Sequence, residues 1–410
     1  MLASQHRPNV LSSLFLYSSF LGFAALWFSP FIVSVVTAIC ALLVIYQWKS
    51  VFNYPNRSIP LILISIVTIG LVNLIFEPKS GDRLLLSIGF LVITLAGFQR
   101  FNVDKSRLSI YLILIAAVVC VINGIAVGNY LSDKEYYDEL LLQSKSIPII
   151  GGFHHIHFGI ISAIVLLGLS GLIVLDLVSK KLKIFSAIML IIILVCFHVL
   201  SSRTGIVSFY IAALVSFAVY SVRKGRYMLL ILGPILMVLM LGITYAASTS
   251  FQNKVASTLE DIDSWGKGTE INHKSMAMRI EAYKVAVHLI KNKPFGTGAY
   301  GQKQAIMKVY EDNNSVLTIE NRKEPHNQFL EFGVKYGWFG IFVMVLLFIS
   351  LLSLTQNVCY PFIGLVAVLF VSMQFESLLE RQVSVYFMSL FIPLYYYLFQ
   401  RNTINGSALT

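Results

Sequence analysis

The amino-acid sequence predicts an all-α polytopic membrane protein. The chain has 410 residues, of which 57% are hydrophobic and only 12% are charged, and a soluble domain of this size needs far less apolar surface. Apolar runs of about 17–20 residues, long enough to cross a bilayer as helices, alternate with short polar connections. A membrane β-barrel would instead show short strands of alternating polarity, and the sequence has no such pattern.

Window hydropathy predicts about twelve spanning helices. They are expected near residues 11–29, 31–48, 60–77, 84–99, 108–127, 158–177, 184–200, 204–222, 228–247, 328–354, 359–373 and 384–400. Two longer polar segments interrupt the series, near 128–157 and 248–327. Three parts are therefore expected: nine helices in residues 1–247, a loop domain in 248–327, and three helices with a cytoplasmic tail in 328–410.

The distribution of basic residues predicts which side of the membrane each connection faces. With the N-terminus inside, the inner connections hold Lys49, Arg57, Arg100, Lys105, Arg107, Lys180, Lys181, Lys183, Arg223, Lys224 and Arg226. The short outer connections are poorer in lysine and arginine, as the positive-inside rule requires. Both long polar segments then lie on the outer face. This asymmetry also accounts for much of the net charge of +11, so no nucleic-acid partner is expected.

The cysteines and the N-terminus add two further expectations. Four cysteines lie within or at the edge of apolar runs: Cys40, Cys120, Cys196 and Cys359. Their placement predicts small core residues rather than a disulfide framework or a zinc site. The first apolar run, from near Leu11, lacks a small-residue cleavage site, so we expect a retained helix rather than a signal peptide.

The outer segment 248–327 contains an amphipathic stretch, HKSMAMRIEAYKVAVHLIKNKPFGTGAYG, at residues 273–301. Met276, Ile280, Val287 and Ile290 recur at helical spacing and predict one apolar face, and the helix is expected to end at Asn292-Lys293-Pro294. The glycine-rich FGTGAYG that follows predicts a turn. It is not a dinucleotide or Walker loop, because no strand precedes it and no Gly-Lys-Ser/Thr follows.

Two arginines are candidates for binding phosphate. Arg203 lies in SSRTG between two apolar runs, where a charge is costly and therefore a functional candidate, although a snorkelling structural arginine fits equally. Arg279 lies on the amphipathic outer helix with Tyr283 one turn on, where position alone favours an ordinary solvated charge over a binding role. Two converging arginines would clamp a pyrophosphate, since each guanidinium donates two hydrogen bonds and stays charged. Lys274 and Lys284 could add positive field.

The stretch EPHNQFLEFGVKYGWFG, residues 324–340, holds a candidate general base. Glu324-Pro325 predicts a helix start, which would place His326 and Asn327 in the first turn. A neutral histidine there can take a proton from a hydroxyl. Asn327 and Glu331, spaced i and i+4, would orient a substrate or support the local geometry. The alternative is a helix cap with an incidental histidine.

Two further groups of titratable residues lie on the outer side. The cluster FHHIH supplies His154, His155 and His157 just before an apolar run, but no cysteine or carboxylate lies near it in sequence. A metal site is therefore the less favoured alternative, and we expect these histidines, His157 among them, to lie at the membrane interface or to line a substrate site. A late outer connection holds Glu376, Glu380 and Arg381, which would pair with one another or complete a site.

The segments SRTG, RIEAYKVAVHLIKNKPFGTGAYG and PHNQFLEFGVKYGWFG, from about Ser201 to Gly340, together resemble the O-antigen ligase and polymerase family. The resemblance implies a GT-C-like, all-helical membrane glycosyltransferase with a large periplasmic loop. It implies an active site on the periplasmic face of the bacterial inner membrane, where a glycan is moved from undecaprenyl pyrophosphate to a hydroxyl acceptor. It assigns Arg203 and Arg279 to the donor pyrophosphate and His326 to the catalytic base. Asn327 and Glu331 match the family motif, and supporting roles are expected for them. Tyr283, Lys284 and His157 are supporting candidates from their positions in the sequence and not from the motif.

The resemblance leaves the acceptor open. An O-antigen ligase transfers the finished glycan to lipid A–core, whereas an O-antigen polymerase, or a related protein O-glycosyltransferase, uses the same donor. The chain length, the single dominant outer loop and the PHN triplet favour the ligase. A transporter or flippase would instead favour inverted repeats, interrupted helices and charges at mid-membrane. The expected partners are the lipid-linked donor, lipid A–core and membrane lipids. The family is metal-independent, and no cofactor is expected.

Overall fold

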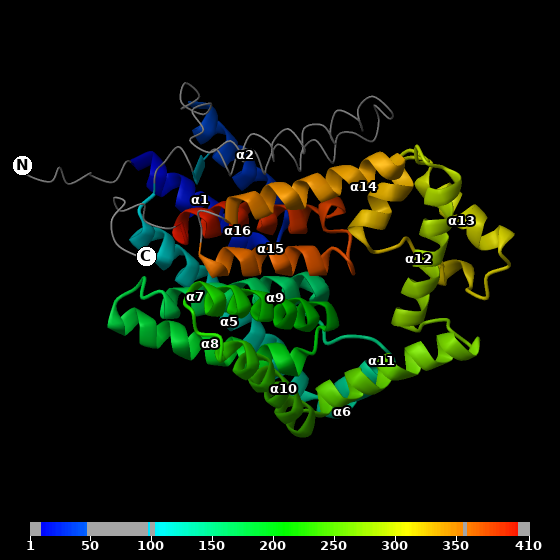
Figure 1. Ribbon diagram of the computed structural model, residues 1–410, viewed down its shortest axis with the longest axis horizontal. Helices are drawn as coiled ribbons and strands as arrows, with labels where there is room; N and C mark the ends of the chain where they lie inside the picture. Colours follow the sequence, from blue (N-terminus) through cyan, green and yellow to red (C-terminus); the bar gives the residue numbers. More distant parts are fainter. Residues whose placement is uncertain (1–9, 47–96, 99–102, 356–358, 401–410) are drawn as a thin grey trace, which may run out of the picture.

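The computed structural model describes residues 10–46, 97–98, 103–355 and 359–400, and the long elements in these ranges are all helices (Figure 1). They are α1 (Val10–Ala25), α2 (Pro30–Tyr46), α5 (Lys105–Ser132), α6 (Lys134–Leu142), α7 (His155–Val174), α8 (Lys180–Leu200), α9 (Arg203–Arg223), α10 (Leu229–Ala247), α11 (Thr249–Lys267), α12 (Ser275–Asn292), α13 (Gln302–Asp312), α14 (Gln328–Leu354), α15 (Tyr360–Ser372) and α16 (Gln382–Leu398). Short 3₁₀ turns lie at η2 (Ile150–Gly152), η3 (Ile319–Asn321) and η5 (Leu378–Glu380).

Within the described ranges, 6 helices are long and apolar enough to cross a bilayer: α5, α7, α8, α9, α10 and α14. The chain is therefore a multi-pass membrane protein, and the long elements of its described part are helical. Helices α1, α2 and α15 are shorter but also apolar. The expected spans near 60–77 and 84–99 lie almost entirely outside the described residues, so the total of about twelve spans stays a prediction.

Helix α7 is the centre of the bundle, where it packs against α5, α8, α9 and α15 (Figure 1). In its apolar window 89% of the residues are buried, against 6% in α10, so α10 presents nearly all of its apolar surface outward, as a lipid-facing helix does. Gly159 of α7 lies against Gly205 of α9, and a Cβ added at Gly205 would lie 2.8 Å from the backbone of Gly159. Small residues at a crossing let two helices approach closely, so this pair fixes the start of α9 against the start of α7.

Helices α11, α12 and α13 form a separate layer across one end of the bundle, on the right in Figure 1, while the α7–α8 connection lies at the opposite end. Helix α12 contacts α11, α13 and α14, and α11 contacts α6. This layer has its own small core, which includes Val285, Leu289, Ile306, Tyr310 and Val334. The expected amphipathic helix is present and ends at Asn292, and the structure adds α11 and α13 on either side of it.

The buried face of α12 differs from the one that the sequence pattern indicated. Of the four predicted apolar positions only Ile290 is buried, and Val287 is 40% exposed. The buried face instead includes Ala277, Ala286 and Leu289. Close packing against α14 and α13 selects small side chains, which a hydrophobicity pattern weighted toward large residues does not identify.

The glycine-rich segments after α12 and within α14 clasp each other. Helix α14 is interrupted at Gly337, whose φ of 65° and ψ of −151° are open only to glycine. The interruption frees the carbonyls of Val334 and Lys335, which accept hydrogen bonds from the amides of Thr297 (2.8 Å) and Gly298 (3.0 Å). In return, the Trp338 amide donates to the Pro294 carbonyl at 3.0 Å. The FGTG turn thereby fixes the end of α12 to the middle of α14.

Candidate functional site

A polar cavity of about 420 Å³ lies where the α11–α13 layer meets the bundle. It is lined by Ser144, Lys145, Ser146, His154, His155, Ile156, Arg203, Thr204, Lys254, Ser275, Met278, Arg279, Lys323, His326 and Glu376. The two arginines and the histidine singled out in the sequence thus face one space, although they come from α9, α12 and the segment before α14.

Arg203 is the first residue of α9, and a break between two helices puts it there. Ser201 ends α8 in the left-handed conformation, and α9 restarts after Ser202. The Arg203 guanidinium donates to Ser257 Oγ at 2.8 Å and lies 3.6 Å from an oxygen of Asp261. Its Nε is buried and has no hydrogen-bond partner among the described residues. Arg203 is therefore held from one side and retains a free donor.

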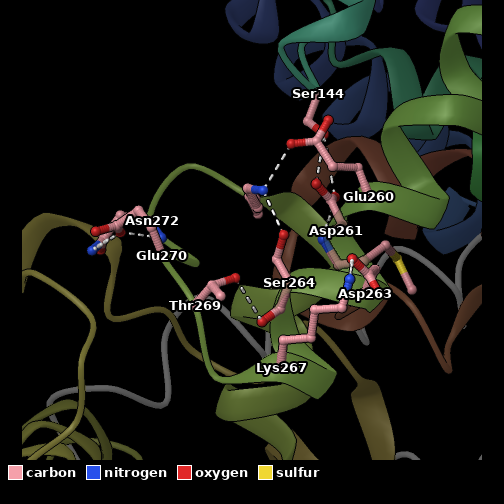
Figure 2. A network of polar contacts seen from close by, with 11 residues as sticks. Ser144, Glu260, Asp261, Asp263, Ser264, Lys267, Thr269, Glu270 and Asn272 are labelled. Carbon is pink, nitrogen blue, oxygen red and sulfur yellow. Dashed lines mark hydrogen bonds and ion pairs between the residues drawn. The ribbon is translucent and has the colours of Figure 1, made fainter.

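Asp261 organises the wall around Arg203, although no sequence pattern singled it out. Its buried carboxylate accepts hydrogen bonds from Ser144 Oγ (3.1 and 3.2 Å) and from the Met276 amide (3.0 Å) (Figure 2). Asp261 on α11 thus ties the loop after α6, the first turn of α12 and Arg203 together. Nearby, Lys274 forms an ion pair with Glu260 at 2.8 Å. Its charge is therefore neutralised by Glu260 and does not add to the positive field of the site.

Arg279 lies on α12 in the cavity wall and is half-buried. It forms no hydrogen bond or ion pair with the residues that the structure describes, so its guanidinium is available to a ligand. Tyr283, one turn on, donates instead to the Gln374 carbonyl at 2.6 Å and fixes α12 to the loop after α15. Lys284 pairs with Glu281 at 3.0 Å and covers the Trp265 ring at 4.5 Å, outside the cavity lining.

His326 lies outside the helix that the sequence pattern placed it in. Helix α14 begins at Gln328, and Asn327 is its N-cap, accepting from the amides of Phe329 (2.9 Å) and Leu330 (3.1 Å). Asparagine is a strong N-cap because its side chain satisfies two free amides, and this sets the helix start three residues later than proline suggested. His326 itself adopts a positive φ of 46° just before the cap.

Glu376 faces His326 from the loop after α15. Its Oε1 lies 3.6 Å from His326 Nδ1, and the glutamate is buried at 3% exposure. Burial alone would raise the pKa of the Glu376 carboxyl, but the hydrogen bond and charge of His326, aided by His157 and Arg279, lower it to about 2. Glu376, grouped in the sequence with Glu380 and Arg381, is thus a carboxylate beside the candidate base.

The histidine cluster lies beside this pair. His154 and His155 line the cavity with stacked rings 4.7 Å apart, and His157 lies buried at the start of α7, with its ring 5.3 Å from that of His154. The Nε2 of His157 is buried with no hydrogen-bond partner in the described part of the chain. No group of three or more His, Cys, Asp or Glu side chains in that part has the spacing of a metal site.

Glu331 belongs to a different network. It is buried on α14, accepts from Gln302 Nε2 of α13 at 2.6 Å and pairs with Lys335 at 3.2 Å. Lys335 in turn contacts Glu380 of η5 at 2.8 Å. Glu331 therefore connects α13, α14 and η5 and does not line the polar cavity. Its placement fits the supporting role that the sequence indicated, which stays a prediction.

A second cavity of about 320 Å³ adjoins the first, and the surface that it exposes is mainly apolar. Its lining includes Ile206, Phe251, Val255, Leu259 and Phe375, with Leu259 63% exposed, so the cavity reaches the outer surface of the protein.

Arg203, Thr204, Lys254 and Arg279 line both cavities. The junction is therefore basic, with a polar space on one side and an apolar space on the other. Lys254 was missed in the sequence. The signal was a stripe of buried polar residues at helical spacing along α11: Ser250, Lys254, Ser257, Asp261 and Ser264.

Residues 187–345 match the family model of O-antigen ligase. The matched segment runs from α8 into α14 and contains Arg203, Arg279 and His326. No curated protein matches the chain. Over residues 187–345 the chain is therefore similar to the O-antigen ligase family, whose members are glycosyltransferase-like ligases of membranes.

Proposed function

We propose that this protein is an O-antigen ligase that transfers a glycan from undecaprenyl pyrophosphate to a sugar hydroxyl of lipid A–core. The observation that carries the proposal is the lining of a single cavity by Arg203, Arg279 and His326, with an apolar cavity adjoining it at the two arginines. The family implies lipid-linked glycan substrates in general. A donor of this class has an apolar tail, a diphosphate and a glycan, in that order, and the two cavities and their basic junction follow the same order.

The diphosphate is placed at the junction. Arg203 has a buried Nε without a partner among the described residues, and Arg279 pairs with none of them. Buried cationic donors without acceptors are costly unless a ligand supplies the acceptors. Diphosphate oxygens fit the planar donor fork of arginine. The first isoprene units of the tail then lie along Phe251, Val255 and Leu259 in the apolar cavity.

In the transfer step, the acceptor hydroxyl oxygen forms a bond to the anomeric carbon of the donor sugar. The bond from that carbon to the phosphate oxygen breaks, and the leaving undecaprenyl pyrophosphate keeps the electron pair. His326 takes the hydroxyl proton. Arg203 and Arg279 stabilise the charge that grows on the leaving group. Because Glu376 faces Nδ1 of His326, the Nε2 atom stays available to the acceptor hydroxyl. The Glu376 carboxylate also stabilises the imidazolium that forms. A single displacement inverts the anomeric centre.

The site is assigned to the periplasmic face of the inner membrane. Supporting this, the α11–α13 layer and the α7–α8 connection lie at opposite ends of the bundle (Figure 1). The first turn of α8, next to that connection, carries Lys180, Lys181 and Lys183, and clustered lysines favour the cytoplasmic side.

The proposal is tested by gel profiling of lipopolysaccharide in a deletion strain complemented with wild type, His326→Ala or His288→Ala. His288 is an exposed histidine of α12 bonded to Asn292 at 2.8 Å and lies outside the cavity lining, so it is the matched control. We expect the deletion strain to show bare core and to retain lipid-linked polymer. Wild type and His288→Ala should restore the normal ladder, and His326→Ala should not. A normal ladder with His326→Ala would refute the base assignment.

The same gel separates the alternatives. Core capped by one repeat unit in the deletion strain would identify a polymerase that uses the same donor. Helix α14 is interrupted at Gly337, a feature that transporters share. A transporter would still move its substrate in the His326→Ala variant, so accumulation of substrate on the cytoplasmic side of the membrane in the deletion strain alone would favour transport.

A further inference from the structure

Lys254 occupies the centre of the basic junction. It lies on α11 at 7% exposure and lines both cavities, as do Arg203 of α9 and Arg279 of α12. Three cationic side chains from three helices therefore meet at the point where the polar space becomes apolar. Of these three cations, only the two arginines have a role in the proposed transfer step.

The partners of Lys254 leave its charge uncompensated. Its amine donates to the backbone carbonyls of Ser144 (3.4 Å) and Lys145, and it forms no ion pair within the described ranges. Asp261 is the acidic residue that acts on it, but that carboxylate is already bound by Arg203, Ser144 Oγ and the Met276 amide. A buried ammonium in this position lacks a counter-ion until an anion enters the cavity.

The neighbouring charges act in the same direction. Burial first, then the positive charges of Arg203 and Arg279, lower the pKa of the Lys254 amine to about 7, and Asp261 only partly opposes them. On the α7 side the neighbouring titratable group is His155. A neutral amine still donates to the two carbonyls, so the empty site avoids a third adjacent positive charge without losing these hydrogen bonds.

We propose that Lys254 is a third cationic contact for the diphosphate and that its amine takes up a proton from solvent when the anion binds. The inference deepens the proposed function and rests on it. A diphosphate beside the amine favours the ammonium form, so binding and protonation reinforce each other. The donor therefore binds more tightly as pH falls from about 9 toward 7, and the proton returns to solvent when undecaprenyl pyrophosphate leaves.

The test is titration calorimetry on the full-length protein in detergent, with geranylgeranyl diphosphate as the probe. The measurement is made at pH 8 in two buffers of different ionisation enthalpy, which yields the number of protons taken up. An amine with a pKa near 7 is roughly nine-tenths neutral at pH 8, so wild type should take up close to one proton. Lys254→Arg keeps a permanent charge, so this variant should bind the probe without taking up that proton.

Further variants separate this inference from the proposed function. Lys254→Met should weaken binding about tenfold or more through loss of a charge-assisted contact. Lys274→Met is the control, because Lys274 is paired with Glu260 outside the cavity lining, and it should bind as wild type does. Weakened binding in Arg203→Ala and Arg279→Ala supports the diphosphate site itself.

Two results would overturn the inference. If wild type and Lys254→Arg take up the same number of protons while the arginine variants bind weakly, Lys254 does not titrate on binding and only the inference fails. If no cavity variant alters binding of the probe, the diphosphate site fails and the proposed function fails with it.

Discussion

Replacement of Gly337 by alanine should open the clasp between α12 and α14. A Cβ at this position would lie 1.8 Å from the Pro294 carbonyl oxygen, which no side-chain rearrangement relieves because both atoms are fixed to backbone. A non-glycine residue at the φ and ψ of Gly337 costs about 1–3 kcal/mol. Loss of the three backbone hydrogen bonds of the clasp, at about 0.5–1.5 kcal/mol each, brings the total to roughly 3–7 kcal/mol.

This perturbation should lower activity more than its distance from the chemistry suggests. The clasp sets α12, and with it Arg279, against the segment that carries His326. A misplacement of about 1 Å between such groups can reduce turnover roughly 100-fold. We therefore expect Gly337→Ala to lose nearly all transfer of glycan to the acceptor and to lower the unfolding temperature in detergent by several degrees. Transfer is measured in membranes with a lipid-linked donor, and unfolding by the fluorescence of the four tryptophans.

The matched control is Gly124→Ala, because a Cβ at Gly124 in α5 meets no atom within 4 Å. That variant should keep wild-type activity and stability. If Gly337→Ala instead behaves like Gly124→Ala, the clasp does not position α12. If it unfolds at the wild-type temperature but loses activity, the clasp opens locally without contributing to global stability.

Three other predictions concern the carboxylates. Glu376→Gln should reduce transfer at least about tenfold while binding of geranylgeranyl diphosphate stays unchanged, because the variant alters the base and not the anion site. The pKa of Glu376 is lowered to about 2 from its ordinary 4.5, so its stabilisation is full above about pH 4.5 and is lost as pH falls toward 2. Acid unfolding curves of Glu376→Gln should therefore be flatter than those of wild type across this range, and identical curves would contradict the pairing with His326. Lys335→Met should destabilise the fold by about 3–5 kcal/mol, because it leaves Glu331 buried without a counter-ion. The double variant Lys335→Met/Glu331→Gln should regain part of the lost stability. Equal destabilisation of the single and the double variant would exclude the ion pair as the cause.

The sequence alone determined the class of the protein and the ends of several helices. Long apolar runs have few structural solutions in a bilayer, so hydropathy predicts spanning helices directly, and the predicted bounds 328–354 agree with those of α14. Arg203 was identifiable because a charge between two apolar runs is costly. Arg279 and His326 were identifiable because they lie in the longest outer polar segment, where binding and catalytic residues concentrate. The resemblance to the family then supplied roles that composition and spacing could not.

The tertiary structure decided which of these residues meet. Hydropathy predicts that a side chain is buried but not which side chain it faces, because that depends on how distant helices pack. Asp261, Lys254 and Glu376 became part of the site only when α11 and the loop after α15 were placed against α9 and the start of α14. Lys284, which the sequence offered as a source of added positive field, pairs with Glu281 instead. A cavity formed by segments far apart in the chain is a property of packing, and a local sequence pattern carries no information about it.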